Sequence, residues 1–365
     1  ETFAGELIRY PPDPSTRSLI MAETPRLAPL PEQPAGVPWP TQDWPRGTLS
    51  AGAPAGKLGT LLDDAFGSSG RLGETHAFLA VQGGAIVAER YDADHGPEDT
   101  YPSWSMAKSI THALAGIALA DGAIELDTPA NVPEWQGEGD RRAAITLEHL
   151  LRMSSGLQFN EDYVDAGVSD TIEMLFGAGK PDVAHYAASK PLEHPPGSFW
   201  LYSSGTTNII ARALARALGL ERAGFEAFMR SRLFDPIGMS SAIPKFDAAG
   251  TFIGSSFCFC TARDFARFGL LYMRGGGWDG ERILPEGWVD HARTPTPHVP
   301  PEEPMGYGAH WWLGLAGPGS FSANGYEGQY TVLVPGKDLI LVRHGKSEAQ
   351  KDDVREWLAA VAECF

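Results

Sequence analysis

The residues with the clearest chemical potential are a serine and a lysine three positions apart, in the segment Ser103 to Lys108 (SWSMAK). On a helix, Ser105 and Lys108 lie one turn apart on the same face, so their side chains can meet. A serine hydroxyl is a poor nucleophile until a base takes its proton, and a lysine can help only where burial or a nearby cation lowers its pKa. The amino end of a helix adds N–H donors for an oxyanion.

The context of this pair favours a catalytic role over the alternative, a surface serine followed by a solvated lysine. Apolar residues recur at helical spacing after Ser105 and predict a helix from about 105 to 120, ended by Gly122. The pair therefore opens a mostly apolar helix and does not lie on a charged, exposed face.

A tyrosine supplies a second proton-handling group. Tyr202 lies in the segment 196–204 (PGSFWLYSS), and a phenolate near two cations can accept the serine proton and later return it to the leaving group. A structural tyrosine that anchors a turn is the alternative reading of the same pattern.

These segments resemble the serine β-lactamases and penicillin-binding proteins. Residues 126–129 (LDTP), 145–157 (ITLEHLLRMSSGL) and 196–204 match family segments in order, and the whole resemblance runs from about 75 to 345. It implies Ser105 as nucleophile, with Lys108 and Tyr202 as its proton-handling partners. It also implies an oxyanion hole from the backbone N–H groups of Ser105 and Ala323, and a hydrogen bond from Ser204 to Lys108 and substrate.

One departure from the family pattern bears on the substrate. Class C β-lactamases carry Lys-Thr-Gly on the strand that lines the site, whereas residues 320–323 here read SFSA. The stretch 321–329 (FSANGYEGQ) instead resembles the branch of 6-aminohexanoate-dimer hydrolases and family VIII carboxylesterases. The resemblance implies an ester or a linear amide as substrate. A β-lactamase or D-amino-acid peptidase, and a non-catalytic penicillin-binding-like ligand sensor, are the alternatives.

Four further residues are candidates for the active site or its surroundings. The resemblance implies that Asn324 belongs to the substrate-binding groups. It also implies that Lys346 holds a substrate carboxylate, the alternative being an exposed lysine at the end of a strand. Tyr163 can line the pocket or simply pack. His112 lies on nearly the same helical face as Ser105, and we interpret it as a histidine at the edge of the core.

The surrounding elements predict an α+β fold of the β-lactamase/transpeptidase type. Hairpins are expected at 76–90 and 330–342, helices at 146–153 (capped by Thr146) and 208–218, and an amphipathic helix at 351–363. We expect a proline-rich arm at 1–50, an α/β domain with an antiparallel sheet at 51–104 and 210–365, and a mostly helical domain at 105–209, with the active site between them. The arm contains Trp39 and Trp44 and is expected to pack on the body, the alternative being a disordered tail.

Composition narrows the partners to small molecules. With 29 basic against 46 acidic residues, the formal charge of −17 argues against nucleic acid and anionic membranes. The three cysteines show no spacing typical of a disulfide framework, and the sequence has no CxxC or HExxH pattern. We therefore predict no disulfide, no metal and no cofactor. We predict a cytoplasmic protein. Because the chain begins with Glu1 rather than methionine, the alternative is a periplasmic protein from which a signal peptide was removed. The sequence does not indicate the oligomeric state.

Overall fold

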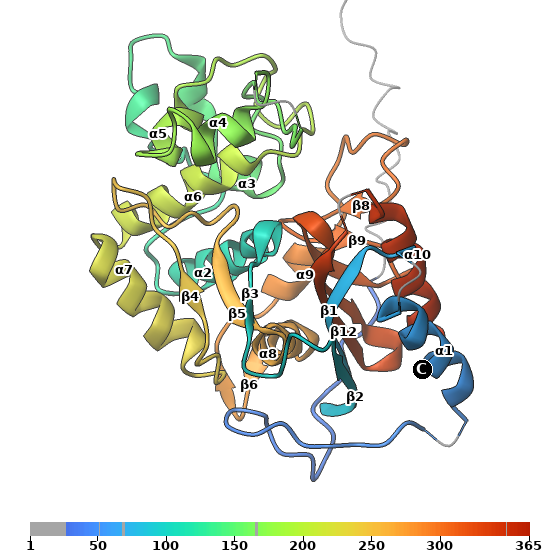
Figure 1. Cartoon of the computed structure of the whole chain (residues 1–365). Helices are drawn as coiled ribbons and strands as arrows, with labels where there is room; N and C mark the ends of the chain where they lie inside the picture. The colour runs from blue at the N-terminus through green and yellow to red at the C-terminus, as the bar shows by residue number, and fades with distance from the viewer. Residues whose placement is uncertain (1–26, 51, 68–69, 165–166, 348) are drawn as a thin grey trace, which may run out of the picture.

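The largest element of the protein is a seven-stranded antiparallel sheet (Figure 1). The structure is a computed structural model that describes residues 27–50, 52–67, 70–164, 167–347 and 349–365. The strand order is β2-β1-β12-β11-β10-β9-β8. The strands are β1 (Glu74–Gln82), β2 (Ala85–Tyr91), β8 (Gly306–Tyr307), β9 (Trp312–Leu313), β10 (Phe321–Gly325), β11 (Gln329–Val334) and β12 (Leu339–Lys346). Both predicted hairpins, β1–β2 and β11–β12, are confirmed.

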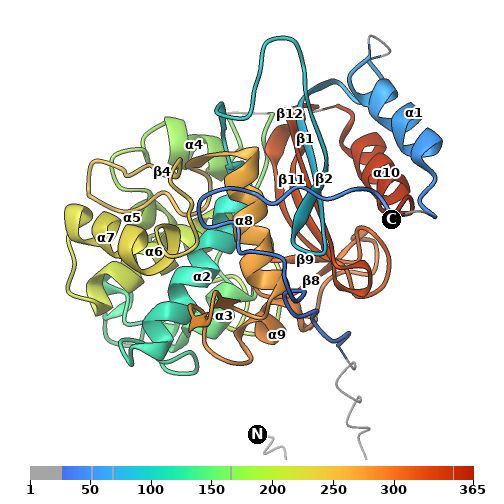
Figure 2. The same ribbon diagram turned by 90° about the horizontal axis from the view of Figure 1, so that it is seen from below.

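Both faces of this sheet are buried because its central strands are apolar at successive positions. In β1, Phe78 and Ala80 face a cluster with α1 (Ala55–Ala65) and α10 (Lys351–Ala362), whereas Leu79 and Val81 face the cluster that contains α8 (Ala262–Met273). Helices α1 and α10 lie side by side on the outer face in Figures 1 and 2. The closing amphipathic helix is confirmed, with its predicted stripe buried: Val354, Trp357, Leu358 and Val361.

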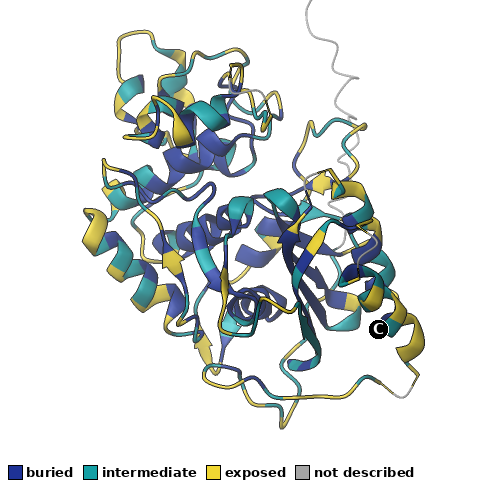
Figure 3. Cartoon of the chain, in the orientation of Figure 1, coloured by how far each residue is buried: buried dark blue, intermediate teal, exposed yellow. Residues whose placement is uncertain are grey.

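The second half of the molecule is mostly helical. The predicted helix 105–120 is confirmed as a 3₁₀ turn, Trp104–Met106, that continues into α2 (Ala107–Ala120), which is buried along most of its length (Figure 3). Thr146 caps its helix as predicted, accepting from the His149 N–H while the His149 ring accepts from the Thr146 N–H. The capped helix is α3 (Leu147–Leu151), and the other helices here are α4 (Asp170–Phe176), α5 (Val183–Ala188), α6 (Ser204–Ala217) and α7 (Arg222–Met229).

Short elements complete the described part of the chain and confirm the predicted α+β class. They are β3 (Thr100–Tyr101), β4 (Ile243–Pro244), β5 (Cys258–Thr261), β6 (Gly277–Trp278), β7 (Glu281–Arg282) and α9 (Trp288–Arg293), with single helical turns at Pro133–Trp135, Arg141–Ala144, Arg230–Phe234, Tyr326–Gly328 and Pro335–Lys337. No helix in the described ranges has both the length and the apolar character needed to cross a bilayer. The domain boundaries at 104/105 and 209/210 stay a prediction.

Residues 27–50, the described part of the expected arm, run along the body of the protein without a helix or strand of their own. Trp44 is buried and donates from Nε1 to the carbonyl of Arg263 at 3.2 Å, and the Trp39 ring lies 5.0 Å from that of Trp278. The tryptophans thus hold this segment against the α8 side of the fold. The rest of the expected arm, residues 1–26, lies outside the described residues.

Candidate active site

The backbone around Ser105 is held in an unusual conformation. Trp104, the residue before it, has a φ of 41°, in the left-handed region that costs a side-chain-bearing residue energy. The Trp104 indole donates to Glu327 at 3.2 Å, and the Ser103 hydroxyl accepts from the backbone N–H of Cys258 at 2.9 Å. These contacts fix the turn, so that Ser105 stands half-buried immediately before α2 begins.

Lys108 lies one helical turn after Ser105 and is only 1% exposed. Its Nζ contacts three oxygens: Ser105 Oγ at 3.0 Å, Ser204 Oγ at 2.9 Å and the carbonyl of Ser255 at 3.0 Å. Burial lowers the pKa of this amine to about 8, against the opposing influence of Glu161. A substantial neutral fraction at physiological pH makes Lys108 suited to accept a proton.

Glu161 stands behind this arrangement, and the sequence patterns did not single it out. One carboxylate oxygen accepts from Ser204 Oγ at 2.5 Å and from the Tyr163 hydroxyl at 2.7 Å, and the other accepts from the Ser204 N–H at 2.7 Å. Ser204 is 1% exposed and joins Lys108 to Glu161. No local motif marks Glu161, because its partner is more than forty residues away in the sequence.

Tyr202 lies beside Ser105 and Lys108, immediately before the cap of α6. The Lys108 Nζ lies 5.0 Å from the centre of its ring. Burial raises the pKa of the phenol, and Glu161 raises it further, against smaller opposing hydrogen bonds with the side chains of Ser105 and Trp312. The phenol is therefore neutral in the resting protein, not the phenolate that the sequence led us to expect, because burial disfavours its charged form; it is suited to donate a proton.

Strand β10 passes beside the turn that carries Ser105, and a glycine permits the approach. A Cβ on Gly325 would lie 2.4 Å from the carbonyl oxygen of Ser103, so only glycine fits at this point. Ala323 lies in the same strand, one position past the last residue paired with β9, with its methyl group in the core. Asn324, between them, is 9% exposed, and its Oδ1 has no hydrogen-bond partner within the described structure.

A cavity of about 540 Å³ opens in front of Ser105. Asn324 and Gly325 line it from β10, Tyr163 from the loop before α4, and Lys351 and Arg355 from α10; its other lining residues include Glu161, Tyr202, Glu303, Trp312, Tyr326 and Glu327. The Tyr163 ring packs against that of Tyr326 at 5.1 Å. Walls from the sheet half and from the helical half make this the cleft that the fold predicts between them.

Three sequence candidates lie apart from the cavity wall. Lys346 ends β12 as an exposed residue paired with Glu74, and it does not line the cavity, whereas its neighbour Ser347 does. Ser204 contacts Lys108 as predicted, but it lies behind the wall, where α6 buries it. His112 is fully buried and contacts the Tyr272 hydroxyl at 2.8 Å, farther inside the core than its predicted place at the edge.

Comparisons with known proteins identify sequences related to this chain. A family model described as Beta-lactamase matches residues 69–363. The 6-aminohexanoate-dimer hydrolase of Paenarthrobacter ureafaciens is 27% identical over 301 residues, which cover 78% of this chain and 75% of that protein. Esterase EstB of Burkholderia gladioli is 29% identical over 211 residues, which cover 53% of this chain and 52% of EstB.

Solved structures share the fold. A Bacillus anthracis protein provisionally named a 6-aminohexanoate-dimer hydrolase superposes with a TM-score of 0.72 at 21% identity, covering 92% of this chain and 90% of that one. A penicillin-binding protein from Bacillus halodurans superposes with a TM-score of 0.63 at 19% identity, covering 84% of this chain and 100% of that one.

Proposed function

Because the chain belongs to the β-lactamase family, we propose that it cleaves an ester or a linear amide through a covalent acyl-enzyme on Ser105. The observation that carries this proposal is the set of contacts around Lys108. A neutral amine has two N–H donors and one lone pair. One N–H of Lys108 can donate to Ser204 Oγ, which donates its own proton to Glu161, and the other can donate to the carbonyl of Ser255. The lone pair of the amine is then left facing the Ser105 hydroxyl.

The first half of the reaction forms the acyl-enzyme. Lys108 takes the proton of Ser105 as its Oγ attacks the substrate carbonyl, and the carbonyl oxygen becomes an oxyanion. We assign the stabilising donors to the backbone N–H groups of Ser105 and Ala323, the latter on the strand that Gly325 allows to approach. Tyr202 donates its proton to the leaving group and regains one from Lys108, which returns both groups to their starting states.

The second half releases the acid. Water enters the cleft, loses a proton to the neutral Tyr202–Lys108 pair and attacks the acyl carbonyl, and the Ser105 oxygen leaves with that proton. The half-buried position of Ser105 at an open cavity gives water this access.

The substrate class follows from the cavity and the relatives. One relative is named for a 6-aminohexanoate dimer and another as an esterase, and both names agree with the absence here of the Lys-Thr-Gly of class C β-lactamases. Asn324 offers a side-chain amide next to the reacting centre, and Tyr163 lies at the cavity wall. Among the described residues that line the cavity, Lys351 and Arg355 are the cations, so we assign a substrate carboxylate to them rather than to Lys346, which does not line it.

A substrate panel tests the proposal. The wild type and Ser105→Ala are assayed with nitrophenyl esters, a linear 6-aminohexanoate dimer and a chromogenic cephalosporin, and a fluorophosphonate adduct is mapped by mass spectrometry. We expect ester or amide turnover that falls by about 10⁴-fold or more in Ser105→Ala, with the adduct on Ser105. Full activity in Ser105→Ala, or an adduct elsewhere, would refute the mechanism. Stoichiometric labelling without turnover would favour the ligand-sensor alternative, and dominant cephalosporin hydrolysis would favour a β-lactamase.

A further inference from the structure

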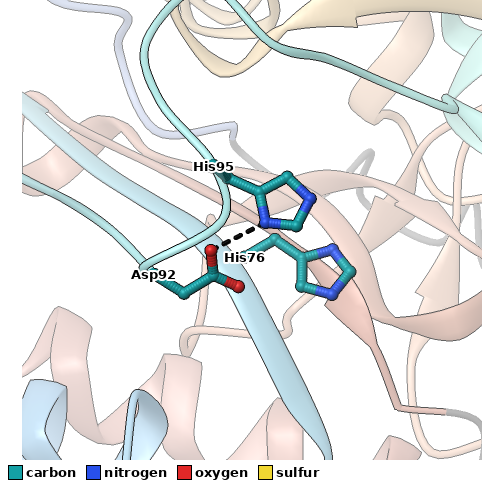
Figure 4. Close-up of side chains that lie close together, drawn as sticks. All are labelled: His76, Asp92 and His95. Atoms are coloured by element: carbon teal, nitrogen blue, oxygen red, sulfur yellow. Dashed lines mark hydrogen bonds and ion pairs between the residues drawn. The ribbon is translucent and has the colours of Figure 1, made fainter.

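Two histidines and an aspartate form a cluster outside the cleft (Figure 4). Each of His76, Asp92 and His95 offers a ligand atom, and the three atoms lie within 4.8 Å of one another. The two imidazole rings are stacked with centroids 4.3 Å apart, and His95 Nδ1 lies 2.7 Å from Asp92 Oδ1. The three side chains are 20 to 30% exposed, so solvent can reach them.

The backbone builds this cluster from two segments. His76 lies in β1, and Asp92 follows the end of β2, where its N–H donates to the carbonyl of His76 at 3.1 Å. The Asp92 side chain then accepts from the N–H of Asp94 at 3.0 Å, which turns the chain and brings His95 back over His76. The sheet register and the turn therefore set the positions of all three side chains.

We propose that His76, Asp92 and His95 bind one divalent transition-metal ion of the zinc class. Two imidazoles and one carboxylate are ligands that zinc accepts, with bonds of about 2.0 to 2.2 Å that place neighbouring ligand atoms about 3.4 Å apart. Because the two rings are stacked, at least one imidazole must rotate about its side-chain bonds before both nitrogens point at one ion and the separations close from within 4.8 Å. Water completes the coordination from the exposed side.

Nearby carboxylates support a cation at this place. Glu74 Oε2 lies 3.1 Å from His76 Nε2, which leaves Nδ1 of this ring as the metal ligand. In proteins, a carboxylate that accepts from the second ring nitrogen orients a metal-bound histidine in this way. Asp99, on the same connection, accepts from the N–H of Gly96 at 2.7 Å. The acidic surface of the chain, with a formal charge of −17, further favours a cation.

The bound ion would fasten the connection between β2 and β3 to strand β1. That connection leads to the nucleophile: the His95 ring lies 5.7 Å from that of Tyr101, which stacks on His344 of β12 at 4.4 Å. Four residues after Tyr101 comes Ser105. The ion is thus a structural clamp on the segment that precedes the nucleophile, and it takes no part in the reaction.

Zinc titration of the tag-free full-length protein, with a fluorescent chelator as competitor, tests the site. We expect one zinc ion per chain, with affinity weakened at least tenfold in His76→Gln, in His95→Gln and in Asp92→Asn. Magnesium and calcium, which favour oxygen ligands, should not compete. Each variant should keep wild-type activity on a nitrophenyl ester in EDTA, since none of these residues contacts the cleft, and this shows that it has folded.

His185→Gln is the matched control. His185 also contacts a carboxylate, Glu134, at 2.7 Å, but it belongs to no three-ligand cluster in the described structure. This variant should bind zinc like the wild type. Substoichiometric binding by the wild type, or unchanged affinity in folded His95→Gln, would overturn the proposal; the latter result would place the ion elsewhere, for example at the buried thiols.

Discussion

Replacing Glu161 by glutamine should move the pH dependence of catalysis to lower pH. In the wild type, kcat/KM is expected to rise about tenfold per pH unit below the Lys108 pKa of about 8, and to level off above it, because only the neutral amine accepts the Ser105 proton. The Glu161 carboxylate favours the charged amine and so holds this pKa up. Removing the negative charge lowers the pKa, and the neutral amine then persists at lower pH.

The hydrogen bonds through Ser204 set the size of this shift. Distances of 2.9 and 2.5 Å limit the separation of the amine and the carboxylate to about 5.4 Å. Two unit charges at that distance interact by about 3 kcal/mol at an effective dielectric constant of 20, and by about 0.8 kcal/mol at that of water. Since one pKa unit equals 1.36 kcal/mol, the apparent pKa should fall by roughly 0.5 to 2 units.

The assay is the pH profile of kcat/KM on a nitrophenyl ester for the wild type, Glu161→Gln and Glu303→Gln. Glu303 also lines the cavity but is not among the groups that influence Lys108, so its removal tests for a general loss of charge. Its profile should keep the wild-type midpoint. An unchanged or raised midpoint in Glu161→Gln would refute the assignment of Lys108 as the base that Glu161 controls.

Three further predictions concern the framework of the site. Gly325→Ala should reduce kcat/KM by about tenfold to a hundredfold, because the new methyl group meets the Ser103 carbonyl and moves β10 away from Ser105. The control is Gly59→Ala, in open space on α1, which should leave ester hydrolysis unchanged. Trp357→Ala should lower the free energy of unfolding in urea by about 3 to 5 kcal/mol, since this 1%-exposed ring fills the space between α10 and the sheet; a loss under about 1 kcal/mol would contradict that packing. Thr146→Ala should cost about 1 kcal/mol in the same assay through loss of its cap, and Thr146→Ser should retain most of that stability.

Local sequence patterns predicted much of the secondary structure. The hairpins at β1–β2 and β11–β12 follow from apolar runs around turn residues, and α2 and α10 follow from helical periodicity with a clear end. The pairing of Ser105 with Lys108 needs only one helical turn, so spacing alone predicted a contact that the structure shows at 3.0 Å. Tyr202 was found through a longer motif, because it lies nearly a hundred residues farther along the chain.

Other features depend on contacts between segments that carry no mutual signal in the sequence. Lys346 was assigned to the substrate from its place after a strand, but the end of β12 turns it to solvent, while α10 brings Lys351 and Arg355 to the cavity instead. Glu161 reaches Ser204 only because α6 packs against the loop that carries it. The cluster of His76, Asp92 and His95 matches no local zinc motif, so the sequence led us to expect no metal, whereas the β1–β2 register and the turn after β2 bring the three together.

The sequence by itself pointed to the candidate nucleophile Ser105, to its partner Lys108 and to the main hairpins and helices, because these depend on periodicity and on neighbours within a few residues. Tertiary structure decided the ionisation of the site and the composition of its walls. Burial of Lys108, the reach of Glu161 and the approach of β10 to Ser103 all require segments distant in the chain to pack together, and electrostatic and steric effects act through space rather than along the sequence.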